Sequence, residues 1–207
     1  MEKVSYALGL SIGNNLLGSG IKDLNTEEFI KAVKTVMAGE KPEMTYEEAK
    51  QVLDTFFHDL ANKINEKNIQ AGKEFLAKNK TQDGVVELAS GLQYQILTSG
   101  SGKSPSITNR VKCHYTGMLL DGTVFDSSVQ RGEPAEFGVN QVIAGWTEAL
   151  QLMKEGDKWR LFIPSDMAYG ARGAGNSIPP HATLIFDVEL PQLNLSLYKA
   201  TPLILAL

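Results

Sequence analysis

The stretch from residue 45 to residue 80 contains no proline and only one glycine, Gly72. Apolar residues recur every three or four positions along its first half, which predicts a helix with one apolar face. Beyond Ile64 the apolar positions become sparse among lysine, glutamate, asparagine and glutamine. A helix of about 35 residues is about 50 Å long, longer than most helices of globular domains. We therefore expect its first half to pack against a partner and its second half to form a solvated arm.

Two shorter helices are predicted before this stretch, over residues 4–18 and from about residue 26 to residue 38. Gly9 and Gly13 lie one turn apart on the first of them. Glycine costs up to about 1 kcal/mol of helix stability relative to alanine, so the pair needs a reason. Close approach of another helix would explain it, and the alternative is that the two glycines merely weaken the helix.

These helices offer too little apolar surface for a comfortable core of their own. Pairing with a second copy of the chain, through intertwined or face-to-face helices, would supply the missing surface. The alternative is that the helices pack onto the second domain of the same chain.

The spacing of apolar residues changes to a period of two after Gly91, which predicts strands. Asp121-Gly122 predicts a hairpin turn, and residues 147–153 predict one short helix. The fold class is α+β, with an all-helical N-terminal region and a mainly antiparallel C-terminal sheet crossed by that helix. The expected domains are a helical domain with its long arm, a sheet domain and an apolar tail, at residues 1–88, 89–194 and 195–207.

Several function classes are excluded by composition and spacing. The formal net charge is −4, so the chain offers no basic footprint for nucleic acid. No stretch is long enough to span a bilayer. The three histidines, His58, His114 and His181, show no metal-ligand spacing, and no nucleophile elbow is present. We expect no metal and no cofactor.

The chain is expected to be cytoplasmic as written. Its N-terminus lacks the basic and apolar regions of a secretion signal. The single cysteine, Cys113, excludes an internal disulfide and reads as a small buried residue. If a leader has been removed, a periplasmic or cell-surface location becomes the expectation.

Aromatic residues stand beside glycines in four short pieces: Tyr115-Thr116-Gly117, the run from Asp121 through Phe125 and Asp126 to Ser128, Val142-Ile143-Ala144-Gly145-Trp146, and the loop from Ala168 and Tyr169 to Ile178-Pro179-Pro180-His181. One carboxylate, Asp126, accompanies them without a nucleophile or a metal cluster. This combination predicts a rigid apolar cleft that holds a ligand and alters its shape.

In this order and spacing, the pieces resemble the FKBP-type peptidyl-prolyl cis-trans isomerases over about residues 90–193. The preceding region resembles the helical dimerisation part of two-domain members such as the macrophage infectivity potentiator proteins. The resemblance implies a half-barrel sheet wrapped on one helix and a homodimer joined through the N-terminal helices. It also implies proline-containing polypeptides as substrates and rapamycin-like macrolides as inhibitors. From the net charge and the lack of a membrane-spanning stretch, we expect neither nucleic acid nor membrane as a partner.

Rotation about an X-Pro bond meets a barrier of about 18–20 kcal/mol and breaks no bond. The twisted amide has lost conjugation and much of its dipole, so a dry apolar pocket favours it over the planar amide. An acceleration of 10³- to 10⁶-fold requires about 4–8 kcal/mol of differential stabilisation.

The catalytic residues expected on this resemblance are Asp126, Trp146, Tyr169 and Phe186. Trp146 serves as the flat floor for the proline ring. The Tyr169 hydroxyl and the Ile143 backbone N–H donate to substrate carbonyls, and Asp126 contacts the twisting amide. The residues expected to bind substrate or to hold Asp126 are Tyr115, Phe125, Arg131, Val142, Ile143 and Ile178.

Taken singly, each of these residues has an ordinary explanation. Tyr115, Phe125 and Phe186 could be core residues, and Asp126 with Arg131 could be a surface pair. Their joint occurrence in the family's order favours a site.

The chain departs from well-known small members of the family at Ala135, where they have a wall aromatic. It also departs at Ala174, where they often have histidine, and at Ser177, where they have an apolar residue. We expect catalysis to survive and the preference for residues flanking proline to change.

Three functions therefore compete at this point. The first is a dimeric prolyl isomerase that acts on folding chains, with chaperone activity. The second is a non-catalytic chaperone or adaptor that binds proline-containing chains. The third is a structural helical protein with a vestigial cleft.

Overall fold

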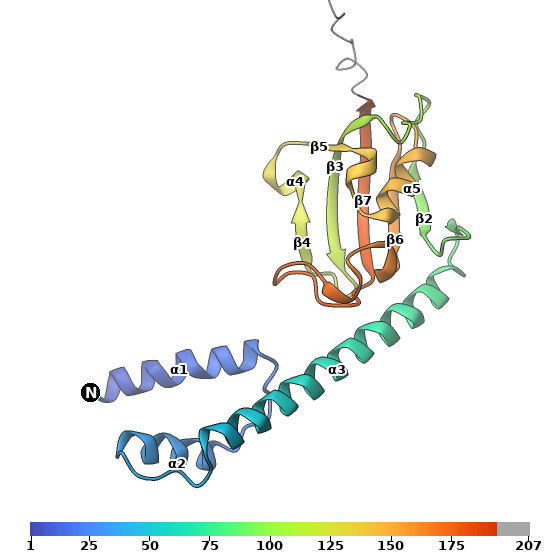
Figure 1. Ribbon diagram of the computed structural model, residues 1–207. Helices are drawn as coiled ribbons and strands as arrows, with labels where there is room; N and C mark the ends of the chain where they lie inside the picture. The colour runs from blue at the N-terminus through green and yellow to red at the C-terminus, as the bar shows by residue number, and fades with distance from the viewer. Residues whose placement is uncertain (194–207) are drawn as a thin grey trace, which may run out of the picture. The chain divides into compact units, whose positions relative to one another are not determined.

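The long helix predicted after residue 45 is one continuous helix, α3 (Tyr46–Asn79, 34 residues; Figure 1). The computed structural model describes residues 1–193, and the predicted tail at residues 195–207 lies outside them. The chain divides into two compact units inside α3, one of residues 1–64 and one that begins at Asn65. The domain boundary expected after residue 88 stays a prediction, because the division into compact units does not show which part of the chain folds independently.

The first unit consists of α1 (Glu2–Gly18), α2 (Thr26–Met37) and the beginning of α3. The two shorter helices are thus present where the apolar periodicity predicts them. The segment between them turns at Gly20, whose φ of 82° is a left-handed conformation that favours glycine. Within 4 Å of the position where a Cβ would stand at Gly20 lie side-chain atoms of Leu60 and Ile64. The link between α1 and α2 therefore packs on α3.

A reciprocal pair of hydrogen bonds caps the N-terminus of α3. The Glu48 backbone N–H donates to Thr45 Oγ1 at 3.2 Å, and the Thr45 backbone N–H donates to the Glu48 carboxylate at 2.7 Å. These bonds satisfy two of the N–H groups that a helix start leaves without partners. The bond from the Thr45 backbone, with that from its hydroxyl, holds the pKa of Glu48 below its usual value.

The first unit has no buried core. Neither α1 nor α2 has a buried residue, and in α3 only Gly72, outside this unit, is buried. Large apolar side chains of all three helices are exposed, among them Val4, Leu8, Ile12, Val36, Leu53 and Phe56. Three helices that bury so little apolar surface are not expected to be stable as a lone unit.

The second unit contains an antiparallel sheet with the strand order β1-β2-β6-β7-β3-β4, and β5 pairs with β3 beside β4. The strands are β1 (Val85–Glu87), β2 (Gln93–Thr98), β3 (Arg110–Leu119), β4 (Val124–Ser127), β5 (Ala135–Gly138), β6 (Lys158–Ile163) and β7 (Leu184–Leu193). Asp121-Gly122 forms the predicted turn between β3 and β4, with Gly122 at a φ of 86°. The predicted α+β class is confirmed.

One short helix, α5 (Ala144–Leu152), lies across one face of the sheet (Figure 1). It begins three residues before the predicted helix at residue 147. The core lies between this helix and the sheet, and it includes Leu92, Val111, Leu150, Met153, Leu161 and Val188. The short elements of the connections are α4 (Ser128–Arg131), η1 (Val139–Gln141), η2 (Ser165–Met167) and η3 (Gly170–Arg172).

Gly145 lets α5 approach the sheet closely. A Cβ at this position would stand 2.6 Å from Cγ2 of Ile163 on β6, closer than side-chain atoms can approach. The glycine beside Trp146 is therefore a packing requirement that places the start of α5 against β6.

The second half of α3 is part of the second unit and packs on its sheet domain. Gly72 is buried, and the ring centroid of Phe75 lies 5.8 Å from that of Phe162 on β6. Gln93 Nε2 donates to the Leu76 carbonyl at 2.9 Å, and Asn79 Nδ2 donates to Gln93 Oε1 at 2.9 Å. The prediction of a solvated arm is wrong on this face. A few apolar and amide side chains are enough to pack this part of α3, because they contact the sheet face opposite α5.

Among the helices of residues 1–193, none is both long enough and apolar enough to cross a bilayer.

Candidate active site

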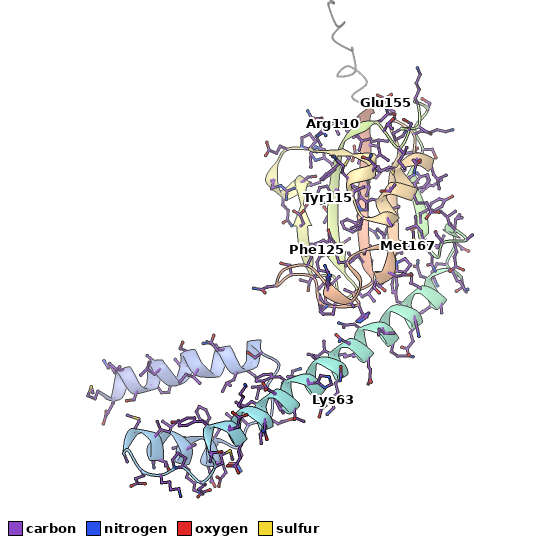
Figure 2. All side chains as sticks on the ribbon, viewed as in Figure 1. Lys63, Arg110, Tyr115, Phe125, Glu155 and Met167 are labelled. Atoms are coloured by element: carbon purple, nitrogen blue, oxygen red, sulfur yellow. The ribbon has the colours of Figure 1, made fainter. Side chains whose placement is uncertain are left out.

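A cleft of about 430 Å³ opens between the sheet and the start of α5. It brings together side chains of β3, β4, β5, α5, β7 and the loops beside them; Figure 2 labels Tyr115 on β3 and Phe125 on β4. Eight of the ten residues expected at the site line it: Tyr115, Phe125, Asp126, Val142, Ile143, Trp146, Tyr169 and Phe186. Segments that are far apart in the sequence thus converge on one cavity.

Trp146 is packed among three perpendicular rings. The centroids of Tyr115, Phe137 and Phe186 lie 5.3, 5.6 and 5.3 Å from that of Trp146, at interplanar angles of 86°, 81° and 84°. Edge-to-face contacts of this kind are favourable and fix the orientation of the indole. Only 4% of Trp146 is exposed, and its indole N–H finds no hydrogen-bond partner within residues 1–193. Trp146 is therefore held by ring packing as a rigid apolar surface.

The walls depend on a glycine in β3. Phe125 and Phe186 meet edge to face, with centroids 5.5 Å apart. A Cβ on Gly117 would stand 2.6 Å from the Phe125 ring and 2.7 Å from the Phe186 ring. Gly117 lies on the same face of β3 as Tyr115, two residues earlier, because side chains alternate along a strand. The absence of a side chain at Gly117 creates the space that the two rings occupy.

Asp126 is the carboxylate of the cleft, and two partners hold it. The Tyr115 hydroxyl donates to one carboxylate oxygen, and the Arg131 guanidinium donates to the other. Arg131 also donates to the Tyr115 hydroxyl oxygen at 3.1 Å, which closes a three-residue network. This arrangement is the one expected from the sequence for Asp126, Tyr115 and Arg131. It orients the carboxylate toward the cleft from the edge of β4.

The network keeps Asp126 charged. Burial by itself raises the pKa of Asp126, but the hydrogen bonds from Tyr115 and Arg131 outweigh it, so the pKa is lower than usual. Burial and the bond to Asp126 raise the pKa of the Tyr115 hydroxyl, which therefore stays protonated and remains a donor. At neutral pH the cleft thus holds one ionised carboxylate at its edge.

Arg131 reaches this network because α4 is docked on β3. The Ser127 hydroxyl accepts from the Gln130 backbone N–H at 3.2 Å and caps the helix, and Gly132 ends it at a φ of 78°. The buried Ser128 hydroxyl accepts from the Tyr115 backbone N–H at 2.8 Å. The Asp126-Ser127-Ser128 run therefore supplies the carboxylate, the cap and the anchor in consecutive residues.

Tyr169 lies between η2 and η3, at the rim of the cleft, and 40% of it is exposed. Ile178 belongs to the same loop, but it is buried and is not among the lining residues. Its backbone exchanges two hydrogen bonds with Ala174, at 2.8 and 3.1 Å. Ile178 thus closes the loop from within the core, and its contact with a ligand stays a prediction.

Two lining residues, Phe137 and Gln141, were not expected from the sequence. Phe137 follows Ala135 by two residues on β5 and so lies on the same strand face. That alternation is a signal that could have identified it. Gln141 directly precedes Val142 and Ile143, and only its place in η1 brings it to the cleft.

Other reactive groups of the described chain lie apart from this chemistry. Cys113 is fully buried, as expected, and burial raises the pKa of its thiol to about 12. Residues 1–193 hold no group of three or more His, Cys, Asp or Glu side chains placed to bind a metal ion.

Comparison with known proteins gives matches over most of the chain. Residues 101–191 match the family model of the FKBP-type peptidyl-prolyl cis-trans isomerases, and residues 1–96 match that of the domain amino-terminal to them. An FKBP-type 22 kDa peptidyl-prolyl cis-trans isomerase of Escherichia coli is 45% identical over 195 residues, which cover 92% of this chain and 94% of that protein.

Two further matches include both regions. The outer membrane protein MIP of Legionella longbeachae is 45% identical over 196 residues, covering 91% of this chain and 84% of that protein. The crystal structure of FkpA from Escherichia coli superposes with a TM-score of 0.75 at 36% identity, covering 92% of this chain and 95% of that one.

Proposed function

The chain belongs to the FKBP-type peptidyl-prolyl cis-trans isomerases, which rotate X-Pro peptide bonds, and we propose that this catalysis takes place in the cleft around Trp146. The observation that carries the proposal is the rigid indole, held by three perpendicular rings, with the ionised Asp126 at the edge of the same cavity. Several of the relatives are named as isomerases, which favours an enzyme over a non-catalytic adaptor.

The proline ring of the substrate lies on Trp146, between the walls that Phe125 and Phe186 form. The cleft excludes water from the amide as its planar dipole is lost, so the twisted state gains relative to solution. We propose that the Ile143 backbone N–H, just before α5, and the Tyr169 hydroxyl, between η2 and η3, each donate to a substrate carbonyl. These two bonds hold the chain on either side of the rotating bond.

Asp126 acts on the amide through its charge. As the bond twists, the proline nitrogen becomes pyramidal and no longer donates electron density to the carbonyl carbon. That carbon becomes more electrophilic and is attracted more strongly to a nearby negative group. A carboxylate that is already oriented needs no reorganisation at that moment, which is the usual source of electrostatic stabilisation in enzymes. Tyr115 and Arg131 supply this orientation through their hydrogen bonds to the carboxylate.

Rapamycin-like macrolides should occupy the same floor and compete with substrate. We expect the protein to accelerate cis-trans exchange of a short Leu-Pro peptide, measured by NMR exchange, and we expect excess rapamycin to return the rate to the uncatalysed value. No acceleration by the uninhibited protein would overturn the isomerase assignment. Rapamycin that binds without slowing exchange would place the catalytic site elsewhere.

The rim differs from that of small family members at Ala135, Ala174 and Ser177. Smaller side chains at the rim leave more room beside the proline, so we propose a weakened preference for the flanking residues and a lower macrolide affinity. A comparison of peptides that differ only in the residue before proline measures this effect.

We propose that the chain is a homodimer joined through its N-terminal helices. Support comes from the exposed apolar side chains of α1, α2 and the start of α3, which leave this unit without a core. A groove of about 580 Å³ runs along α1 with Gly9 and Gly13 in its lining. A Cβ on either glycine would meet no described atom within 4 Å. Close packing of a helix from a second copy would explain why both positions are glycine.

Replacing Gly13 with leucine should therefore favour the monomer. The added side chain fills the groove where the partner backbone would lie, although leucine is a better helix former than glycine. We expect the dimer dissociation constant to rise at least about tenfold, measured by sedimentation equilibrium. Ser11→Leu, outside the groove lining of α1, adds the same side chain and should leave the dimer intact. Equal behaviour of the two variants, or a monomeric parent protein, would contradict the proposal.

Two clefts in one dimer would hold an unfolded chain at two prolines. The second contact then forms at the effective concentration that the tether sets, so the dimer binds such chains more tightly than one cleft does. We propose a chaperone activity on this basis, which the Gly13→Leu variant should reduce while turnover on short peptides is kept.

A periplasmic or cell-surface location is the proposal that the comparisons favour. One similar protein is named as an outer membrane protein, and none of the comparisons supports the cytoplasmic expectation. Fractionation of the native cells measures the location directly.

A further inference from the structure

Asn68, on the second half of α3, donates from Nδ2 to the carbonyl of Pro180 at 2.9 Å, and this bond is partly buried. The two residues are 112 positions apart in the chain and belong to the same compact unit. Pro180 lies in the long loop that begins beside Tyr169. The bond therefore joins α3 to the loop that carries a residue of the cleft.

The residue after Pro180 is in a strained conformation. His181 has a φ of 58°, and within residues 1–193 it is the only residue other than glycine with a positive φ. Such a conformation costs free energy and persists only where surrounding bonds enforce it. The Asn68 bond holds the carbonyl on the N-terminal side of His181. On His181 itself, the backbone N–H donates to the Gly170 carbonyl at 2.8 Å.

The second of these bonds reaches the residue beside Tyr169, which lines the cleft. Gly170 follows Tyr169, so the His181 N–H fixes the carbonyl of the residue next to Tyr169. A continuous path therefore runs from the Asn68 amide through Pro180 and His181 to Gly170 and Tyr169. It has two hydrogen bonds and otherwise covalent links.

Asn68 can hold the loop because α3 is anchored beside it. A Cβ on Gly72 would stand 2.3 Å from Thr183 Oγ1, so the helix backbone lies directly against the chain just after His181. Phe75 on Phe162, one turn further on, makes a second anchor. The position of this segment of α3, and with it that of Asn68, is thus set by packing on Thr183 and on Phe162 of β6.

We infer that Asn68 is a positioning residue for prolyl isomerisation, which places the Tyr169 hydroxyl at the rim of the cleft by enforcing the conformation at His181. The inference rests on the proposed function of the cleft. It assigns the segment of α3 after residue 64 a role in catalysis besides its structural one.

The test begins with Asn68→Asp, which keeps the shape of the side chain, replaces the N–H donor with an oxygen and adds a negative charge beside the Pro180 carbonyl. We expect kcat/KM on a Leu-Pro peptide to fall about three- to tenfold, the effect of one lost hydrogen bond. Glu66→Ala, an exposed change on the same helix, should leave kcat/KM unchanged. An unchanged kcat/KM in Asn68→Asp would overturn the inference.

A double-mutant cycle with Tyr169→Phe separates positioning from general destabilisation. If Asn68 acts through the Tyr169 hydroxyl, Asn68→Asp should have little further effect once that hydroxyl is absent. An equal loss of kcat/KM in both backgrounds would show that Asn68 acts by another route and would contradict the inference.

Hydrogen exchange provides a readout that does not depend on activity. The His181 amide should exchange at least about threefold faster in Asn68→Asp than in the parent protein or Glu66→Ala, because its bond to Gly170 opens more often. Unchanged protection would refute the positioning role while leaving the isomerase proposal untouched. Faster exchange in a protein without turnover would refute the isomerase proposal and keep the structural link.

Discussion

Replacing Asp126 with alanine should lower kcat/KM for a Leu-Pro peptide about 10- to 150-fold. A hydrogen bond to a charged group is worth about 1.5–3 kcal/mol, and each 1.36 kcal/mol is tenfold in rate. The variant loses the carboxylate itself and also leaves Arg131 and the Tyr115 hydroxyl without their partner. The measurement is NMR exchange or protease-coupled isomerisation at neutral pH, where Asp126 is ionised.

Stability should change much less than turnover, because the Asp126 and Arg131 side chains are 40% and 47% exposed and solvent screens their attraction. Chemical denaturation of the variant checks this. Glu133→Ala removes an exposed carboxylate just beyond α4 and should keep full turnover. Asp126→Asn keeps the shape without the charge and separates an electrostatic role from a positional one. If turnover persists in Asp126→Ala, the chemistry does not depend on this group.

Replacing Gly117 with alanine should damage both the fold and the cleft. The new methyl group would stand within 2.7 Å of both the Phe125 and the Phe186 rings, so at least one wall must move. Overpacking of this kind costs about 1–3 kcal/mol of unfolding free energy. We expect turnover to fall about tenfold as well, because the space between the walls that receives the proline changes shape.

Two measurements decide this prediction: denaturant unfolding of the sheet domain and isomerisation of the Leu-Pro peptide. Gly18→Ala is the matched control, since a Cβ there meets no described atom within 4 Å. It should be neutral or slightly stabilising, as glycine is the poorer helix former. A Gly117→Ala protein with the stability and turnover of the parent would contradict the prediction, because the two rings would then move aside with no loss of unfolding free energy or activity.

Most of the fold could be predicted from the sequence because its signals are local. Apolar spacing of three and four residues marks α1, α2 and α3, and a spacing of two marks the strands around Val111 and Leu161. The Asp121-Gly122 turn needs only its own two residues. The start of α5 was predicted three residues late, because Ala144 and Gly145 carry no periodic signal and become helical against Ile163.

The candidate site could be predicted only for residues that belong to the family motifs. Tyr115, Asp126 and Arg131 come together as the motif order implies, and Trp146 is held among aromatic rings. Ile178 belongs to the same loop motif, yet it points into the core and not into the cleft lining. A motif identifies residues that belong together, but not which side of the backbone each one occupies.

The amino-acid sequence by itself determined the kinds of elements, their order and the family of the cleft, since these depend on periodicity and on short motifs. Only the tertiary structure decided why Gly117 must be glycine, that Phe137 joins the lining, and that one face of α3 packs on the sheet. The Asn68 bond to Pro180 spans 112 positions. Contacts between residues so distant along the chain arise only when the sheet and α3 are packed together, and no local pattern encodes them.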